Sequence, residues 1–323
     1  MPKTLPLVGH KLQREQLIGD IENDNVAHAY LFSGPRHLGK MAVARWFATN
    51  LMLEDKDPDS QDDVRGQIER MVHPDLLVLD QLWMEKTCDD WDVIAKTSNV
   101  PQQHRAKNGA KTDTISIDDI RALQERLYET GASKWRCCII RSVERMKDES
   151  ANAFLKILEE PPQGVVFILT TQSNTSLLPT VVSRTRSIRF NRLTLPELRE
   201  LLVDTEADDS QFILHLSQGA PGTLVKLKDN PDLLREQRLM HSKAISFWKA
   251  KSIRERLALI DLLKDRGELA NQFIMHLSIA LREQGIDTQS TQVDALMDLV
   301  KALKTNANRQ LMAQKFVLTV SNN

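Results

Sequence analysis

The sequence is poor in cysteine, in aromatic residues and in long apolar runs. Its three cysteines, Cys88, Cys137 and Cys138, are odd in number and too few for a disulfide framework, so a reducing cytoplasm is expected. No apolar run approaches the roughly 18 residues of a membrane span, and the opening MPKTLPLVGH lacks the apolar core of a signal peptide. The net charge of −1 argues against strong binding of nucleic acid by this chain alone.

The sequence does have a helix-rich composition over 323 residues, enough for two or three domains. In residues 1–191, short and continuously apolar segments alternate with segments of helical periodicity, which predicts an α/β domain with a parallel sheet covered on both faces. We expect five strands at 28–32, 76–79, 137–140, 165–169 and 187–190, and helices at 11–22, 41–53, 117–128 and 151–160. The acidic segment 54–63 and the polar segment 86–114 are expected to be loops.

After residue 191 the strand signals fade. We expect a small helical domain over 192–230, in which Thr194 is a helix N-cap and the turn Gly219-Ala-Pro-Gly222 separates two short helices. Residues 231–323 are expected to form a third, all-helical domain. Its clearest helix, 268–284, is closed by Gly285 and has an apolar stripe formed by Leu269, Phe273, Ile274, Leu277 and Leu281.

One motif points to phosphate chemistry. Gly34-Pro-Arg-His-Leu-Gly39-Lys40-Met41 follows a predicted strand, opens a predicted helix, and matches G-x-x-x-x-G-K without the final Ser or Thr. In such a loop the backbone N–H groups and the helix N-terminus bind phosphates, and Lys40 supplies the cation. The simpler interpretation is a glycine-punctuated turn between strand and helix.

The residues that would hold Mg²⁺ beside this loop are missing. Met41 offers no oxygen ligand. After the strand at 137–140, where an ATPase of this kind carries carboxylates, the chain has Arg141 and Ser142. We therefore predict no metal site, no cofactor and no ATP hydrolysis by this chain. Metal-free nucleotide or anion binding by Lys40 and Arg141 stays open, as does a simple pairing of Arg141 with Glu144.

Several segments resemble a known family. Ala27-His-Ala-Tyr-Leu-Phe-Ser-Gly-Pro-Arg36, Ser150-Ala-Asn-Ala-Phe-Leu-Lys-Ile-Leu-Glu-Glu-Pro-Pro162 and Asn306-Ala-Asn-Arg-Gln-Leu311 are similar to the AAA+ clamp-loader subunits of bacterial DNA polymerase III. The resemblance implies an AAA+ domain at 1–191, a lid at 192–230 and a collar at 231–323. It also implies partners: a delta subunit and gamma/tau-type ATPase subunits, with the sliding clamp and primed DNA reached through the complex. The family's four-cysteine zinc module is absent from 54–72.

The resemblance assigns further roles. Gly222 stands where the family's ATPases carry a lid arginine, so the chain resembles the ATPase-inactive member of the ring. Ser183-Arg184 matches the motif that projects an arginine finger into a neighbouring ATP site, where a fixed guanidinium stabilises the transferring phosphoryl group. The alternatives are that Arg184 belongs to a solvated basic edge with Arg186, Arg189 and Arg192, and that the chain is an active, gamma/tau-like ATPase or an anion sensor.

Five further positions and one segment carry weaker expectations. Thr171, at the end of the fourth strand, is either a polar sensor or a strand cap. His28 is expected to be a core histidine and His73 a turn residue. Cys137 and Cys138 are expected to behave as small hydrophobic residues within their strand. The basic residues of the segment 86–114 are expected to be solvated.

Overall fold

A computed structural model describes residues 7–70, 72–79, 114–128, 131, 133–203, 205–264, 267–283, 285, 291–303, 305 and 307–321. Internal contacts divide the chain into two units, Met1–Lys226 and Leu227–Asn323. The division into three domains stays a prediction. Cys88 and the segment 86–114, apart from Thr114, lie outside the described residues. Within the described ranges, no helix is both long and apolar enough to cross a bilayer.

The first unit is built on a parallel sheet. In its described part the strands are β1 Ala29–Ser33, β2 Leu76–Leu79, β3 Arg136–Ile140, β4 Val165–Thr171 and β5 Arg186–Arg189. Their order is β2-β3-β4-β1-β5, and every pairing is parallel. The predicted fold class is therefore confirmed, because all residues of β1 to β4 are buried, as continuously apolar strands require.

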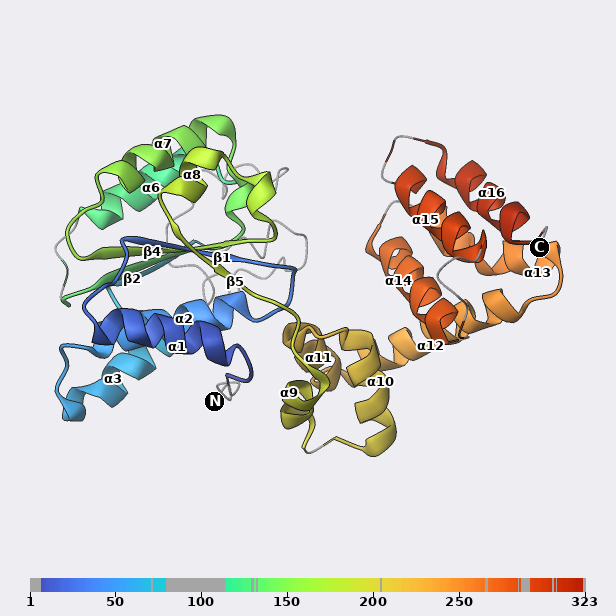
Figure 1. Ribbon diagram of the computed structural model, residues 1–323, viewed down its shortest axis with the longest axis horizontal. Helices are drawn as coiled ribbons and strands as arrows, with labels where there is room; N and C mark the ends of the chain where they lie inside the picture. The colour runs from blue at the N-terminus through green and yellow to red at the C-terminus, as the bar shows by residue number, and fades with distance from the viewer. Residues whose placement is uncertain are drawn as a thin grey trace. The chain divides into compact units, whose positions relative to one another are not determined.

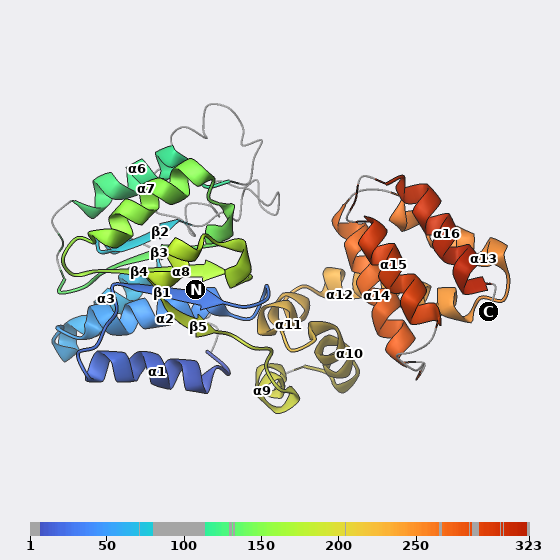
Figure 2. The ribbon, with the colours of Figure 1, turned by 45° about the horizontal axis from the view of Figure 1, so that its top comes forward.

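Helices cover both faces of this sheet (Figures 1 and 2). One face packs against α1 Lys11–Glu22, α2 Lys40–Leu53 and α3 Pro58–Glu69. The other packs against α6 Ile117–Leu127, α7 Asp148–Glu159 and α8 Pro179–Ser183. Two short 3-10 turns, η2 Val143–Arg145 and η3 Asn174–Ser176, follow the ends of β3 and β4. The predicted helices at 11–22, 41–53, 117–128 and 151–160 are thus confirmed to within three residues at each end.

The expectation of a loop at 54–63 is wrong over its second half. Residues 58–69 form α3, which has Pro58 in its first turn and Asp57 as its N-cap residue. Val64 and Ile68 are buried against the core, while Asp59, Asp62 and Asp63 face solvent. Two apolar residues four positions apart are enough to anchor three turns of helix, because a helix needs only one buried stripe.

Short helices follow β5 in the first unit. They are α9 Leu195–Arg199, η4 Glu200–Leu202, α10 Ala207–Ser217 and α11 Pro221–Lys228. Thr194 caps α9 as predicted, and its backbone N–H donates to the Glu197 carboxylate at 2.8 Å. The turn at 219–222 separates α10 from α11, as expected.

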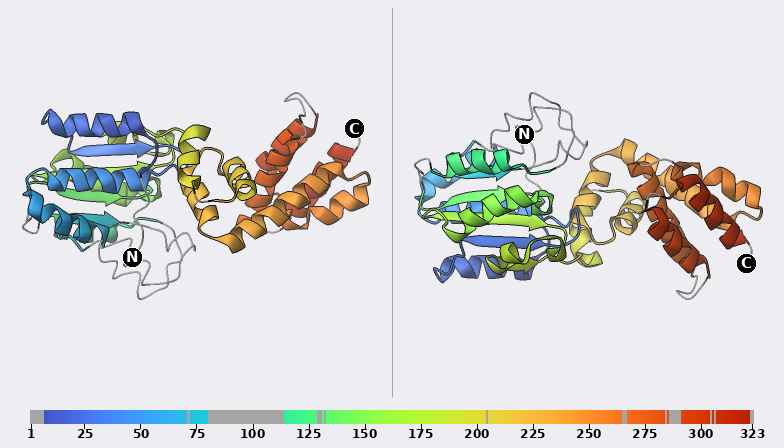
Figure 3. Two further views of the ribbon diagram at one scale, coloured as in Figure 1. Left: turned by 90° about the horizontal axis from the view of Figure 1, so that it is seen from below. Right: turned by 90° about the horizontal axis from the view of Figure 1, so that it is seen from above.

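The second unit is all-helical in its described part, as predicted. It contains α12 Pro231–Lys249, α13 Ile253–Leu259, η5 Asp261–Leu263, α14 Glu268–Glu283, α15 Thr291–Leu303 and α16 Arg309–Ser321, several of which lie side by side in Figure 3. Phe273, Leu277 and Leu281 are buried in its core, whereas Leu269 is 57% exposed and does not join the predicted stripe. Gly285 has the left-handed φ of 67° expected just beyond a helix.

A chain of polar side chains, three of them buried, joins α12 and α14. His276 is fully buried, and its Nε2 lies 2.8 Å from Gln237 Oε1. Its Nδ1 lies 3.4 Å from Nδ1 of His241, whose Nε2 lies 3.1 Å from Glu283 Oε2. Burial, and to a lesser degree the charge of His241, lowers the pKa of His276 to about 4.

This depressed pKa predicts a loss of stability in acid. The unfolded chain takes up a proton on His276 below about pH 6.5, whereas the folded chain does so only near pH 4. The free energy of unfolding of the second unit should therefore fall as the pH falls through this window, by about 2 kcal/mol at pH 5. Urea unfolding at pH 7.5 and pH 5, followed by amide exchange in α14, measures it. His276→Gln should lose this part of the pH dependence, while His28→Gln should keep it. An unchanged dependence in His276→Gln would contradict the assignment.

Candidate functional site

The phosphate-loop motif lies at the carboxyl edge of the sheet, between β1 and α2. Gly34 has a φ of 146°, and a Cβ there would lie 2.4 Å from the Phe190 carbonyl oxygen. Gly39 has a φ of 87° and is the N-cap residue of α2. Both positions require glycine for conformational or steric reasons. The predicted arrangement of strand, loop and helix is therefore present around Gly34, Gly39 and Lys40.

The ammonium group of Lys40 bonds to the loop that precedes it. Its Nζ donates to the Gly34 carbonyl at 2.5 Å and to the Pro35 carbonyl at 2.6 Å. The pKa of Lys40 is lowered to about 8, mainly by burial; the charges of Arg141 and Arg36 lower it, and that of Glu144 raises it. The cation expected to meet phosphate thus has two backbone acceptors of its own chain.

Met41, Arg141 and Ser142 are the residues expected in place of magnesium ligands and catalytic groups. Met41 packs against the core cluster under α2. Arg141 follows β3, and its charge acts directly on Lys40. Ser142 has a left-handed φ of 57°, and its N–H donates to Thr170 Oγ1 at 3.1 Å. Where a metal site needs convergent oxygen ligands, this chain therefore presents an apolar side chain, a cation and a strained serine.

Glu144 is a carboxylate that the sequence considerations treated only as a partner for Arg141. Its Oε1 accepts from the Gln172 N–H at 3.3 Å, just after β4, and its charge raises the pKa of Lys40.

Thr171 is nearly fully buried; its hydroxyl donates to the Ser173 carbonyl at 3.1 Å and accepts from the Ser173 N–H. This geometry is that of a turn at the strand end, in line with the strand-cap alternative.

The loop is also held from two other segments. The Gly222 N–H donates to the His37 carbonyl at 2.8 Å. A Cβ at Gly222 would lie 2.9 Å from that oxygen and 3.3 Å from His37 Cα, so a side chain at this position would collide with the loop backbone. On the other side, Nε2 of the buried His10 lies 2.6 Å from the Leu38 carbonyl oxygen.

Arg184 and Ser183 lie at the end of α8. The Ser183 hydroxyl donates to the Thr180 carbonyl at 3.1 Å. Arg184 donates from Nη1 to the same carbonyl at 3.1 Å and from Nη2 to Glu159 Oε1 at 2.7 Å. Its side chain is 36% exposed. The structure thus orients this guanidinium with two acceptors, one of which sequence reasoning missed although Glu159 lies in the most specific of the quoted segments.

Two other arginines of this edge, Arg186 and Arg192, also donate hydrogen bonds. Arg186 pairs with Asp20 at 2.5 Å and donates to the Asn25 carbonyl at 3.1 Å. Arg192 donates to the Gln218 carbonyl. Arg184, Arg186 and Arg192 of the basic edge thus have acceptors of their own, while Arg189 is exposed.

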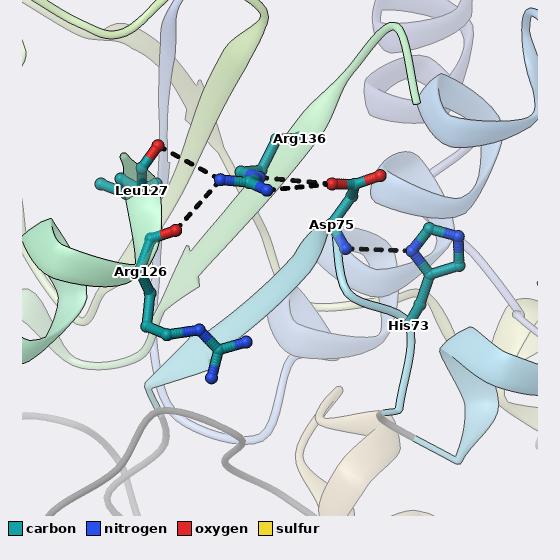
Figure 4. A network of polar contacts seen from close by, with 5 residues as sticks. All are labelled: His73, Asp75, Arg126, Leu127 and Arg136. Carbon is teal, nitrogen blue, oxygen red and sulfur yellow. Dashed lines mark hydrogen bonds and ion pairs between the residues drawn. The ribbon is translucent and has the colours of Figure 1, made fainter. Parts of the chain in front are cut away.

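A buried ion pair lies at the other edge of the sheet, where both β2 and β3 begin (Figure 4). Arg136 Nη2 lies 3.3 Å from Asp75 Oδ1, with both side chains almost inaccessible to solvent. Arg136 Nη1 also donates to the carbonyls of Arg126 and Leu127, at 3.0 and 3.2 Å. His73 Nδ1 accepts from the Asp75 N–H at 3.2 Å, which confirms its role as a turn residue. Through Arg136, hydrogen bonds therefore connect the end of α6 to β3 of the sheet.

Two smaller expectations can also be compared with the structure. His28 is exposed, so the expectation of a core histidine is wrong; only its backbone joins the sheet, where its carbonyl accepts from the Phe167 N–H. Cys137 and Cys138 are fully buried, and burial raises the pKa of both thiols, which confirms their expected behaviour as inert apolar residues.

The parallel sheet with order β2-β3-β4-β1-β5, the loop at Gly34–Lys40 and the appended helices define an AAA+ type of α/β protein. The sequence family described as DNA polymerase III, delta subunit, matches residues 9–194. The chain belongs to this family.

Individual relatives agree with this membership. The delta' subunit of DNA polymerase III from Bacillus subtilis is 27% identical over 195 residues, or 59% of this chain and 50% of the relative. The tau subunit from Escherichia coli is 27% identical over 226 residues, or 68% of this chain and 31% of the relative. The matched region thus spans half or less of these relatives.

A solved structure is similar over the whole fold. The crystal structure of a DNA polymerase III gamma subunit-related protein from Thermotoga maritima matches 96% of this chain and 99% of that chain. The TM-score is 0.50 and the sequence identity is 20%, so this likeness concerns the fold alone.

Proposed function

We propose that this chain is a delta'-like subunit of a DNA polymerase III clamp loader, one that hydrolyses no ATP itself and supplies Arg184 to the ATP site of a neighbouring subunit. Similarity to delta' and to tau is equal in identity, so it favours neither an inactive nor an active subunit. The distinction depends on the residues around Lys40.

The observation that carries the proposal is the cation after β3. Arg141 follows β3 at the place where an ATPase of this class holds Mg²⁺ with carboxylates. Burial is the main cause of the lowered pKa of Lys40, and the positive charge of Arg141 acts in the same direction. A second cation there repels the metal. Met41 adds no ligand, and the loop backbone leaves no room for a side chain at position 222. Glu144 is the one nearby carboxylate described, and it already accepts a backbone N–H.

The same contacts support the absence of a bound cofactor. A nucleotide would have to displace the Gly34 and Pro35 carbonyls from Lys40 before its phosphates could bind there. Its phosphates would also meet the Glu144 carboxylate, whose charge reaches this lysine. Labelled ATP is therefore expected to show no saturable binding to the isolated chain at millimolar concentration.

Reconstitution tests the proposal. The purified chain alone is expected to show no ATP turnover, with or without primed DNA. Added to a delta subunit and gamma/tau-type ATPase subunits, it should co-purify with them and raise their turnover in the presence of the sliding clamp and primed DNA. Turnover by the chain alone, stimulated by primed DNA, would instead establish the active gamma/tau-like alternative.

A further inference from the structure

The last residue of α7 holds the side chain of the proposed arginine finger. Glu159 Oε1 lies 2.7 Å from Arg184 Nη2, across 25 residues of sequence. A second contact, from Nη1 to the Thr180 carbonyl, comes from the helix that carries Arg184. Two acceptors on two different helices fix the plane of a guanidinium, whereas a single acceptor leaves the guanidinium free to rotate about that one hydrogen bond.

The backbone under Glu159 is firmly placed. Phe154, Ile157 and Leu158 of α7 are buried in the core. At the other end of the helix, the buried Ser150 hydroxyl lies 2.8 Å from the carbonyls of Ile115 and Lys147. The carboxylate itself is half exposed, at 50%. A well-packed helix thus presents a half-exposed carboxylate to the guanidinium of Arg184.

An ion pair this exposed adds little to folding stability. The ion pair instead reduces the conformational freedom of Arg184. A free arginine side chain samples many rotamers, and this freedom is lost when the side chain binds a phosphate group. Two of the five N–H groups of the guanidinium are used by Glu159 and Thr180. The remaining ones can bond to phosphate oxygens without loss of the anchor.

We propose that Glu159 is a positioning residue, which orders Arg184 before it meets the phosphates of a nucleotide bound to the neighbouring subunit. This inference rests on the proposed function of Arg184. Ordering one long side chain in advance corresponds to a rate advantage of about twofold to tenfold. Because the finger acts on the transition state, the advantage lies in kcat and not in the KM for ATP.

The test uses the reconstituted clamp loader with clamp and primed DNA. Its readout is the phase of ATP hydrolysis that Arg184→Ala removes. Glu159→Ala should slow this phase about twofold to tenfold at unchanged KM, and Glu159→Gln, which keeps an acceptor, should slow it less. Glu160→Ala, the exposed neighbour, is the matched control and should leave it unchanged.

A double variant separates positioning from a structural role. Glu159→Ala should have no further effect in a chain that already carries Arg184→Lys, whose ammonium cannot form the same fork. A wild-type or faster rate in Glu159→Ala, or an equal loss in both backgrounds, would overturn the inference while leaving the role of Arg184 intact. If Arg184→Ala removes no phase at all, the proposed function itself fails.

Discussion

Arg184→Ala in a reconstituted ring should slow ATP hydrolysis at the site next to this chain by about 10³-fold, in the range seen when arginine fingers are removed from other NTPases. The cause is the loss of a fixed, always-charged planar donor from the transferring phosphoryl group. The other ATP sites do not receive Arg184 and should keep their rates. Single-turnover hydrolysis is therefore the right measurement. In such a measurement, the fast phase of ATP hydrolysis by the ring should lose only the amplitude that comes from the site next to this chain.

Two further variants make this result specific. Arg189→Ala removes an exposed arginine of the same edge and should change the rate less than about twofold, because a solvated charge outside the site acts only through screened, long-range attraction. Arg184→Lys keeps the charge but not the bidentate geometry, so it should restore little. A ring with Arg184→Ala that retains the whole fast phase would leave the solvated-edge interpretation in place.

Local patterns were sufficient to predict most of the fold. The continuous apolar runs at β1, β3 and β4 have no polar face to expose, so a sheet covered on both sides follows from the sequence alone. The helix α3 was missed because its surface is acidic and only Val64 and Ile68 mark the buried stripe. Two apolar residues in a segment of twelve are too weak a periodic signal to outweigh the composition.

The site was predictable in its residues but not in its contacts. The motif at Gly34–Lys40 can be identified from spacing, and so can Met41, Arg141 and Ser142, which stand where magnesium ligands and catalytic groups are expected. The bond from Gly222 to the His37 carbonyl cannot, because it joins backbone atoms far apart in sequence and depends on how α11 packs. The same applies to the pairing of Glu159 with Arg184, in which the helix phases of α7 and α8 decide whether the two side chains meet.

The second large effect concerns stability. Arg136→Met should lower the free energy of unfolding of the first unit by about 3–5 kcal/mol, because it leaves the fully buried Asp75 carboxylate without its cation. It also deprives the carbonyls of Arg126 and Leu127 of a donor. Urea denaturation at neutral pH, followed by amide exchange in β3, measures the loss. Arg121→Met breaks an ion pair that is more than half exposed, and should cost less than about 1 kcal/mol.

The double variant Asp75→Asn with Arg136→Met distinguishes the pair from simple loss of packing. If the cost of Arg136→Met comes from the stranded carboxylate, removal of that charge should return part of it, and the double variant should be more stable than the sum of the single effects predicts. Additive losses would instead mean that the methylene groups of Arg136 and its bonds to the end of α6 account for the effect. A loss below about 1 kcal/mol in Arg136→Met would show that water reaches Asp75 in the folded chain, which the complete burial of this side chain does not allow.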